Sequence, residues 1–255
     1  MIFDTHAHYD DKQFDKDRKA LLDSMKEGGV GTIVNSGATL SSCKRSIELA
    51  GQYPFMYASV GIHPDEAGSL NEETFAWLKD QLTNEKVVAV GEIGLDYYWD
   101  REQHDTQKKW FIRQLGLARD MQLPVVIHSR DAAEDTMAVL KEHAADLKCD
   151  IHCYSYSLEM VREYMKMGYY IGVGGVVTFS NAKKLKRVVA EVPVERILLE
   201  TDCPYLAPSP HRGKRNSSLN LKYVAEEIGQ LKGMSCEEVI AQTEKNAREF
   251  YGIAK

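Results

Sequence analysis

The stretch MIFDTHAH, residues 1–8, opens a chain of 255 residues and decides between two folds. Its apolar start predicts a β-strand over Met1–Thr5, and residues two apart in a strand project to the same face. His6 and His8 would then point the same way where the strand meets the following loop. Two neutral imidazoles on one face can chelate a divalent metal ion, but they can equally be surface or supporting histidines. The choice depends on whether other strands also end in metal-binding residues.

Short apolar runs rich in β-branched residues recur along the chain at the spacing of βα units. They predict eight strands, over Met1–Thr5, Thr32–Asn35, Met56–Gly61, Val87–Glu92, Val125–His128, Asp150–His152, Tyr169–Val173 and Ile197–Glu200. Stretches with helical periodicity lie between and after them, over Phe14–Gly28, Ser41–Tyr53, Glu72–Leu82, Thr106–Met121, Ala132–Ala145, Leu158–Met167, Ala182–Val192, Leu219–Leu231 and Ser235–Tyr251. Ser235 and Glu238 form the S-x-x-E pattern of a capping box at the start of the last helix.

Alternating strands and helices predict a parallel sheet covered by helices. Eight such units favour an α/β fold of the (β/α)8 TIM-barrel type, and we expect one domain over residues 1–255. The competing fold is a doubly wound open sheet, which usually has fewer strands and a glycine-rich phosphate loop after the first. Here the first strand ends in histidines. Gly172, Gly174 and Gly175 lie around the end of the seventh strand, where they serve either turn geometry or a phosphate site.

Composition sets the limits within which a function must be sought. The chain is 44% hydrophobic, which is enough for a sizeable core, and no apolar run approaches the ~18 residues of a membrane span. No basic region followed by an apolar one marks a secretion signal, and five scattered cysteines without a CxxC favour a reducing cytoplasm. The net charge of −6 means that a polyanion would need a local positive site. Without an exposed heptad or apolar patch, a monomer is expected.

Metal-binding side chains gather at the carboxyl ends of the predicted strands, where a barrel places its catalytic groups. Five of the eight histidines lie there with three acidic residues, and the set is His6, His8, His63, Glu92, His128, His152, Glu200 and Asp202. Each of them alone could be a buried polar group with satisfied hydrogen bonds. Random scatter would not favour one end of the strands, so the set as a whole predicts a metal site.

Four histidines and two carboxylates suit two divalent ions that share a bridging carboxylate. Glu92 is the expected bridge because its strand lies between the first strand and the strands that carry His128 and His152. We predict one ion held by His6, His8, Glu92 and Asp202, and a second held by Glu92, His128 and His152. Asp202 can also orient or deprotonate the attacking water, so Asp202 and Glu92 are the predicted catalytic residues. The ions outweigh the two carboxylates in charge, and a phosphate diester would be attracted.

A loop with prolines and a glycine follows the eighth strand and carries Arg212, Lys214 and Arg215. Three cations beside a predicted metal site favour phosphate contacts over an ordinary solvated loop. Arg130, two residues after His128, is a further candidate for substrate binding, as is His63. The run Lys183–Arg187 is better explained as the solvated face of a helix.

Aromatic residues follow two of the predicted ligand strands. They are Tyr97, Tyr98 and Trp99 after the fourth strand, and Tyr154 and Tyr156 after the sixth. Aromatic rings near a phosphate site can stack on bases, and they can equally pack the loops that carry them. Cys153 and Cys203 adjoin predicted ligands, but no pattern indicates a thiolate nucleophile.

Taken together, the motifs resemble the TatD family of metal-dependent hydrolases and deoxyribonucleases, from Asp4 to the final helix. The likeness is carried by DTHAH at 4–8, GIHP at 61–64, GEIGLDY at 91–97, VIHSRDA at 126–132, LETDCPYL at 199–206 and RGKRN at 212–216. This resemblance implies a TIM barrel, a two-metal site and deoxyribonuclease activity, often 3′-to-5′ on single strands. The ligands of the family correspond to His6, His8, Glu92, His128, His152 and Asp202.

The chain departs from the family pattern at two places on the rim of the expected site. The family usually continues the His-Cys pair with Phe-Ser-Gly, where this chain has Tyr154-Ser155-Tyr156. It usually follows the asparagine of RGKRN with an acidic residue and proline, where this chain has Ser217 and Ser218. Neither change removes a predicted ligand, and both alter the surroundings of the substrate.

Three functions compete at this point. The first is a nuclease acting on DNA phosphodiesters with two divalent ions. The second is a hydrolase of another ester in the same site, such as an aminoacyl ester on tRNA, and the third is a non-catalytic scaffold. The cations at 212–215 favour a phosphate-bearing substrate without separating DNA from tRNA, and the intact ligand set counts against a scaffold. Imidazole-rich sites suit zinc, cobalt or nickel, while nucleases often use magnesium or manganese.

Overall fold

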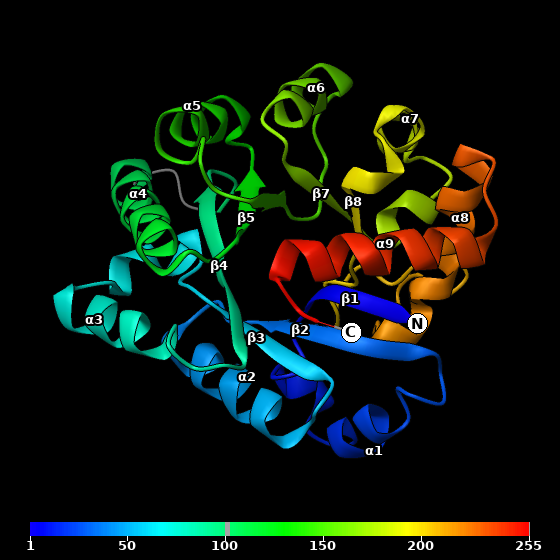
Figure 1. Ribbon diagram of the computed structural model, residues 1–255, viewed down its shortest axis with the longest axis horizontal. Coiled ribbons are helices and arrows are strands. Elements are labelled where there is room, and N and C mark those ends of the chain that lie inside the picture. Colours follow the sequence, from blue (N-terminus) through cyan, green and yellow to red (C-terminus); the bar gives the residue numbers. More distant parts are fainter. Residues whose placement is uncertain (100–102, 255) are drawn as a thin grey trace. The chain divides into compact units, whose positions relative to one another are not determined.

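The structure, a computed structural model, describes residues 1–99 and 103–254. Within them it contains the expected alternation of strands and helices (Figure 1). Strand order follows chain order from β1 to β8, and every described pairing between strands is parallel. The chain forms two compact units, one of Met1–Asn35 with Cys153–Lys255 and the other of Ser36–His152. A single domain therefore stays a prediction.

The first unit contains the beginning and the end of the chain. Its strands are β1 (Ile2–Ala7), β2 (Val30–Ser36, of which the last residue belongs to the second unit), β7 (Tyr170–Val173) and β8 (Ile197–Leu199). Its helices are α1 (Arg18–Asp23), α6 (Leu158–Lys166), α7 (Lys183–Glu191), α8 (Leu221–Lys232) and α9 (Cys236–Tyr251). Helix α9 runs across β1 and β8 (Figure 1), where the ring of Tyr251 stacks on Phe3 and its hydroxyl donates to the Thr5 carbonyl at 2.8 Å.

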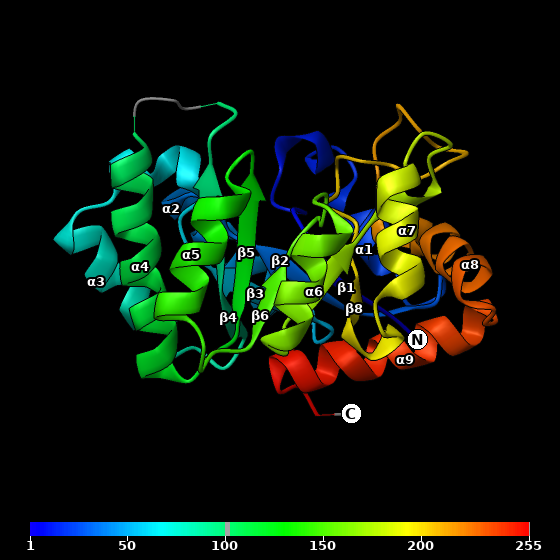
Figure 2. The ribbon, with the colours of Figure 1, turned by 90° about the horizontal axis from the view of Figure 1, so that it is seen from above.

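The second unit contains the middle of the chain. Its strands are β3 (Met56–Val60), β4 (Val87–Asp96), β5 (Val125–Arg130) and β6 (Cys149–Ile151). Its helices are α2 (Leu40–Gln52), α3 (Glu72–Gln81), α4 (His104–Met121) and α5 (Ala133–His143), and α4 and α5 stand beside β4 and β5 (Figure 2). All residues of β4 are buried, as expected for a parallel strand covered by helices.

Short 3₁₀ helices occupy several of the connections. They are η1 (Lys12–Phe14), η2 (Pro64–Ser69), η3 (Gly175–Thr178), η4 (Val194–Arg196) and η5 (Ser218–Asn220). None of the helices in the described ranges combines the length and the apolar character needed to cross a membrane. The capping box predicted for Ser235 and Glu238 is confirmed, since each side chain bonds the backbone N–H of the other residue.

The prediction of one continuous helix over Phe14–Gly28 was wrong. This stretch forms η1 and the short helix α1, followed by turns up to Gly29, whose φ is +83°. The Arg18 side chain explains the break, because it donates to the backbone carbonyls of Tyr9 and Asp11 and to the carboxylate of Asp15. These bonds hold the chain before Arg18 in a folded loop and prevent the helix from starting earlier.

Two glycines allow β4 to lie close to β5 in the register that the site needs. A Cβ on Gly94, whose φ is +149°, would lie 1.9 Å from the carbonyl oxygen of His128. A Cβ on Gly91 would lie 2.7 Å from the Cβ of Val126. The register pairs Gly94 with His128, and the neighbouring same-face residues Glu92 and Asp96 therefore flank the histidine.

The glycines around the end of β7 allow close packing, a role that differs from the turn geometry and the phosphate site considered for them. A Cβ on Gly172 would lie 2.2 Å from Oε2 of Glu200, and one on Gly175 would lie 2.0 Å from the carbonyl oxygen of Leu206. The segment that follows β8 can therefore approach β7 closely only because these positions carry no side chain.

Candidate metal centre

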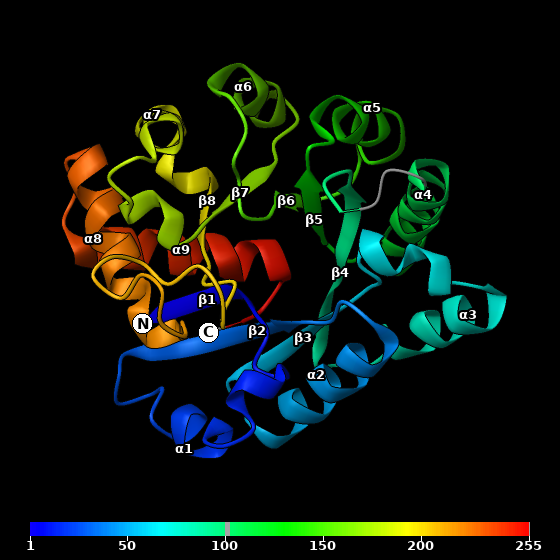
Figure 3. The same cartoon turned by 180° about the vertical axis from the view of Figure 1, so that it is seen from behind.

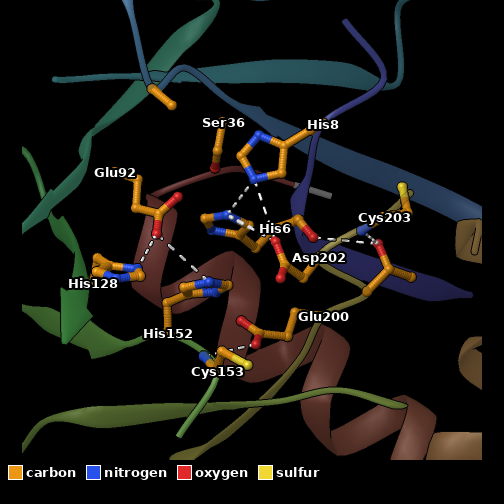
Figure 4. A network of polar contacts seen from close by, with 12 residues as sticks. His6, His8, Ser36, Glu92, His128, His152, Cys153, Glu200, Asp202 and Cys203 are labelled. Carbon is orange, nitrogen blue, oxygen red and sulfur yellow. Dashed lines mark hydrogen bonds and ion pairs between the residues drawn. The ribbon is translucent and has the colours of Figure 1, made fainter. Parts of the chain in front are cut away.

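Three donor atoms meet in the first unit, in what we call the strand-one cluster: His6, His8 and Asp202 (Figure 4). Nε2 of His6 lies 3.0 Å from Nε2 of His8, and Oδ1 of Asp202 lies 3.9 Å and 3.4 Å from these two nitrogens. Two facing imidazole nitrogens can share only one proton in a hydrogen bond, whereas a cation would satisfy both lone pairs and the carboxylate. The donor set therefore fits a divalent metal ion.

Backbone hydrogen bonds between β1 and the segment after β8 hold the strand-one cluster together. The N–H of Asp202 donates to the His6 carbonyl at 2.9 Å, and the N–H of His8 donates to the Cys203 carbonyl at 2.8 Å. Figure 3 shows this segment (gold) beside β1 (dark blue), where Ala7 and Cys203 form a parallel bridge. Asp202 has a φ of +54°, a conformation that aspartate tolerates better than most residues.

Asp4 lies beneath the strand-one cluster on the same face of β1 as its two histidines. Its carboxylate accepts hydrogen bonds from the hydroxyls of Thr201 at 2.7 Å and Ser218 at 2.6 Å. Burial raises the pKa of Asp4 to about 7, although these hydrogen bonds lower it. One of the two departures from the family pattern thus has a structural role, because Ser218 ties η5 to β1.

Three imidazoles converge on one carboxylate oxygen in the second unit, in what we call the strand-four cluster: His63, Glu92, His128 and His152. Figure 4 shows Glu92 with His128 and His152. Oε1 of Glu92 lies 2.7 Å from Nδ1 of His128, and 3.7 Å from Nε2 of both His63 and His152. Glu92 and His128 lie within β4 and β5, whereas His63 and His152 lie in the segments that follow β3 and β6. Glu92 is only 4% exposed, so a cation among these groups would be largely shielded from water.

His128 also lies 3.0 Å through its Nε2 from Oδ2 of Asp96. Burial lowers the pKa of His128, but hydrogen bonds with Asp96 and Glu92 and the charge of Glu92 outweigh it and raise the pKa to about 9. Burial raises the pKa of Asp96, but the interaction with His128 and two backbone N–H bonds outweigh it and bring the pKa below its usual value. Asp96 thus orients the ring of His128 toward Glu92.

The metal-free protein is expected to lose stability as the pH rises from 6.5 to about 9. The pKa of His128 is above its ordinary value of 6.5. The interactions of protonated His128 with Asp96 and Glu92 therefore stabilise the folded protein fully below pH 6.5, and this stabilisation is lost as the pH rises through about 9. Urea unfolding in a chelator over this pH range measures the decline. Asp96→Asn should show a shallower decline, and an equal decline in both proteins would contradict the role of the pair.

The structure brings together, within each unit, most of the residues predicted for each ion. His6, His8 and Asp202 meet in the strand-one cluster, and Glu92, His128 and His152 meet in the strand-four cluster. His63, predicted for substrate binding, lies with its ring centroid 4.2 Å from that of His128, inside the strand-four cluster. That Glu92 bridges two ions stays a prediction from strand order.

Asp96 and Asp4 are two supporting residues that sequence reasoning did not assign. Asp96 lies four residues from Glu92 within β4, and Asp4 lies two residues from His6 within β1, so each shares a strand face with a predicted ligand. That spacing was a usable signal. Glu200, the remaining strand-end carboxylate, accepts a hydrogen bond at 2.8 Å from the N–H of Cys153, which has a φ of +47°.

The predicted phosphate-binding cations differ in their surroundings. The guanidinium of Arg130 lies 3.9 Å from the ring centroid of Tyr98 and 5.5 Å from that of Trp99. Arg212 lies 4.3 Å over Phe179, and both Arg212 and Lys214 are exposed. Arg215 forms a two-pronged ion pair with Asp17 and also donates to the Gln13 carbonyl. Its guanidinium is therefore already engaged within the protein.

The aromatic residues on the rim also divide into two kinds. Trp99 and Tyr98 are 67% and 48% exposed, so their rings are accessible from solvent. Tyr154 is buried, and its hydroxyl donates to the Ser157 carbonyl at 2.6 Å, so it packs the loop before α6.

Comparisons with known proteins cover the whole chain. The family model described as TatD related DNase matches residues 3–252. The uncharacterized metal-dependent hydrolase YabD of Bacillus subtilis is 46% identical over 254 residues, covering 99% of this chain and 100% of the relative. A protein of Erwinia amylovora named 3′-5′ ssDNA/RNA exonuclease TatD is 30% identical over 259 residues, with 99% and 100% coverage.

A solved structure supports the same likeness. The crystal structure of YjjV, a TatD homologue from Escherichia coli K12, matches with a TM-score of 0.93 and 31% identity. The match covers 99% of this chain and 98% of that chain. Together with the strand order, it confirms the predicted TIM-barrel fold.

Proposed function

Because the chain belongs to the TatD family of metal-dependent hydrolases, we propose that it is a nuclease that degrades single-stranded DNA from the 3′ end. The observation that carries this proposal is the group formed by Arg130 with Tyr98 and Trp99. Arg130 follows the cluster residue His128 on β5, and the exposed rings lie just beyond β4. A cation beside exposed aromatic rings suits a phosphate next to an unpaired base. The printed name of the Erwinia amylovora relative agrees with this assignment.

The two clusters supply ligands for the metal chemistry of the family. We propose that the strand-one cluster holds one divalent ion and the strand-four cluster a second, with Glu92 as the shared ligand. When bound, such ions would lower the pKa of water and neutralise the charge that develops on the phosphate oxygens.

The side chains around the clusters orient the reacting groups. Asp202 is partly exposed and fixed by its backbone bond to His6, so its carboxylate is placed to accept the proton of the attacking water. Asp96 keeps the ring of His128 turned so that Nδ1 faces Glu92. Arg130 and Arg212 would bind phosphates on the strand and keep the scissile bond in place.

The test is digestion by metal-reconstituted protein of 5′-end-labelled single- and double-stranded DNA. We expect a ladder of products shortened one nucleotide at a time from the 3′ end, faster on single strands and abolished by a chelator. Aminoacyl-tRNA is assayed in parallel, since an ester hydrolase acting on another bond is the alternative. Deacylation without any DNA cleavage would replace the nuclease by that alternative.

Arg212→Ala should weaken the binding of single-stranded DNA and make it less dependent on salt. Loss of one phosphate contact lowers the slope of log K against log salt concentration by about 0.7. Fluorescence anisotropy of a labelled oligonucleotide over a salt series measures the slope. Lys245→Ala on α9, which removes an exposed cation elsewhere, is the control. Equal slopes for the two variants would remove Arg212 from the path of the substrate.

A further inference from the structure

A groove in the first unit lies between the first turns of α6 and α7. It has a volume of about 320 Å³ and is lined by Ser157, Leu158, Glu159, Lys183, Lys184 and Arg187. Three of these six residues are cations, all exposed, and one is an acid. The lining contains no aromatic ring and no amide side chain, so a ligand would be recognised by its charge.

The cations of α7 point in two directions. Lys186 is engaged with Glu227 of α8 at 2.7 Å, and Leu185, Val188 and Val189 are buried. Lys183, Lys184 and Arg187 are spaced so that they share the remaining face, which is the one that lines the groove. The basic run is thus more than a uniformly solvated face, because it concentrates positive charge in one concave place.

The acid in the groove leaves a clear excess of positive charge. Bonds from its own backbone N–H and from Ser157 hold the pKa of Glu159 below its usual value, as do the charges of Arg162 and Arg187. Glu159 is therefore ionised and offsets one of the three cations. The amino end of α6 adds a partial positive charge from its unpaired backbone N–H groups. A local excess of this kind in a chain of net charge −6 favours a polyanionic ligand.

Short segments of chain connect the groove with the strand-one cluster. Ser157 follows Cys153 by four residues, so their Cα atoms lie at most about 14 Å apart. The backbone N–H of Cys153 donates a hydrogen bond to the carboxylate of Glu200, and Glu200 lies two residues before Asp202. On the other side, Ser209 donates to the Thr178 hydroxyl at 2.8 Å and Arg212 covers Phe179, four residues before Lys183. Figure 2 shows the loop after β8 (gold) beside the start of α7.

We propose that this groove binds backbone phosphates of a single-stranded nucleic acid, several nucleotides from the bond that is hydrolysed. The inference rests on the proposed nuclease function and extends it, since it makes efficient hydrolysis depend on strand length. Arg212 would lead the strand from the strand-one cluster toward Lys183, Lys184 and Arg187. Because the groove offers charge and no base-stacking surface, binding there is independent of base sequence.

Binding is tested with the triple variant Lys183→Ala/Lys184→Ala/Arg187→Ala in its metal-loaded form. The probes are fluorescein-labelled 20-mers of deoxythymidine and of uridine, with phosphorothioate linkages to resist cleavage. We expect the salt slope to fall by about 2 and the affinity at low salt to fall by at least about tenfold. The matched control is Lys79→Ala/Lys141→Ala/Lys245→Ala, which removes the same charge from α3, α5 and α9. A groove variant that behaves like this control would overturn the proposal.

A second arm uses a variant that should gain affinity. Glu159→Gln removes the negative charge from the groove while keeping the size of the side chain, so we expect binding about two- to fivefold tighter at low salt. Circular dichroism and the melting temperature establish that each variant is folded. Unchanged or weaker binding by Glu159→Gln, in a folded protein, would count against phosphates in the groove.

Hydrolysis separates this proposal from the proposed function itself. The ratio of kcat/KM for a 20-mer to kcat/KM for a dinucleotide should fall about tenfold in the triple variant relative to wild type. An unchanged ratio would overturn the groove as a site for the strand. If wild-type protein cleaved neither substrate, the nuclease function would fail, while the anisotropy measurements would still decide whether the groove binds nucleic acid.

Discussion

Asp202→Asn should reduce phosphodiester hydrolysis by about 10²- to 10⁴-fold, the range that a general base contributes. The asparagine keeps the shape of the side chain but cannot accept the proton of the attacking water. It also binds a metal ion more weakly, because the charge near Nε2 of His6 and His8 is lost. The measurement is kcat on single-stranded DNA at saturating metal, with metal content checked on the same sample.

The control for this variant is Asp11→Asn, at a carboxylate that accepts hydrogen bonds from the hydroxyl of Tyr205 at 3.0 Å and from the N–H of Gln13 at 2.7 Å. It removes the same charge from a residue outside both clusters, and asparagine is also a good N-cap, so the fold is kept and hydrolysis should stay within about threefold of wild type. Full activity of Asp202→Asn at wild-type metal content would rule out its role in proton transfer.

Glu92→Gln should lower hydrolysis by at least about 10³-fold and reduce the metal content of the purified protein. One oxygen of Glu92 faces three imidazoles, at 2.7, 3.7 and 3.7 Å, so neutralising it removes the negative charge on which the strand-four cluster is built. Because glutamine has the same volume, the buried surroundings of the side chain are kept. Metal analysis after dialysis and kcat on DNA measure the two effects.

Glu73→Gln, at an exposed site in the first turn of α3, is the matched control for Glu92→Gln. Its metal content and rate should equal those of wild type. A Glu92→Gln protein that retained both would show that the carboxylate charge is dispensable, and the assignment of the strand-four cluster as a metal site would have to be abandoned.

Most of the fold could be predicted because the strands of a parallel barrel are buried on both faces. Val87–Val90 and Val125–Ile127 are apolar throughout, so they stand out from the helices around them. The extension of β4 beyond Glu92 could not be predicted in the same way, since Gly91 and Gly94 are typical of strand breaks. Only the close approach of β5 explains why a strand continues through both.

The ligand positions could also be predicted, since histidines and carboxylates at strand ends form an unusual pattern. What the pattern could not supply was the set of partners reached through tertiary contacts. Asp17 and Arg215 are 198 residues apart, and their ion pair leaves no local trace in the sequence. The same is true of Ser218 and Asp4, which are 214 residues apart. Roles that depend on such pairs become visible only in three dimensions.

The bonds between β1 and the segment after β8 have a consequence for the order of synthesis. A ribosome that has made the chain as far as β7 has produced His6 and His8, but neither Asp202 nor the hydroxyls of Thr201 and Ser218 that hold Asp4. The two histidines must wait for about four-fifths of the sequence before their carboxylate partner exists. The strand-one cluster therefore forms late, because its contacts join residues that are far apart in the sequence. A nascent polypeptide cannot assemble the cluster before Asp202 has been synthesised.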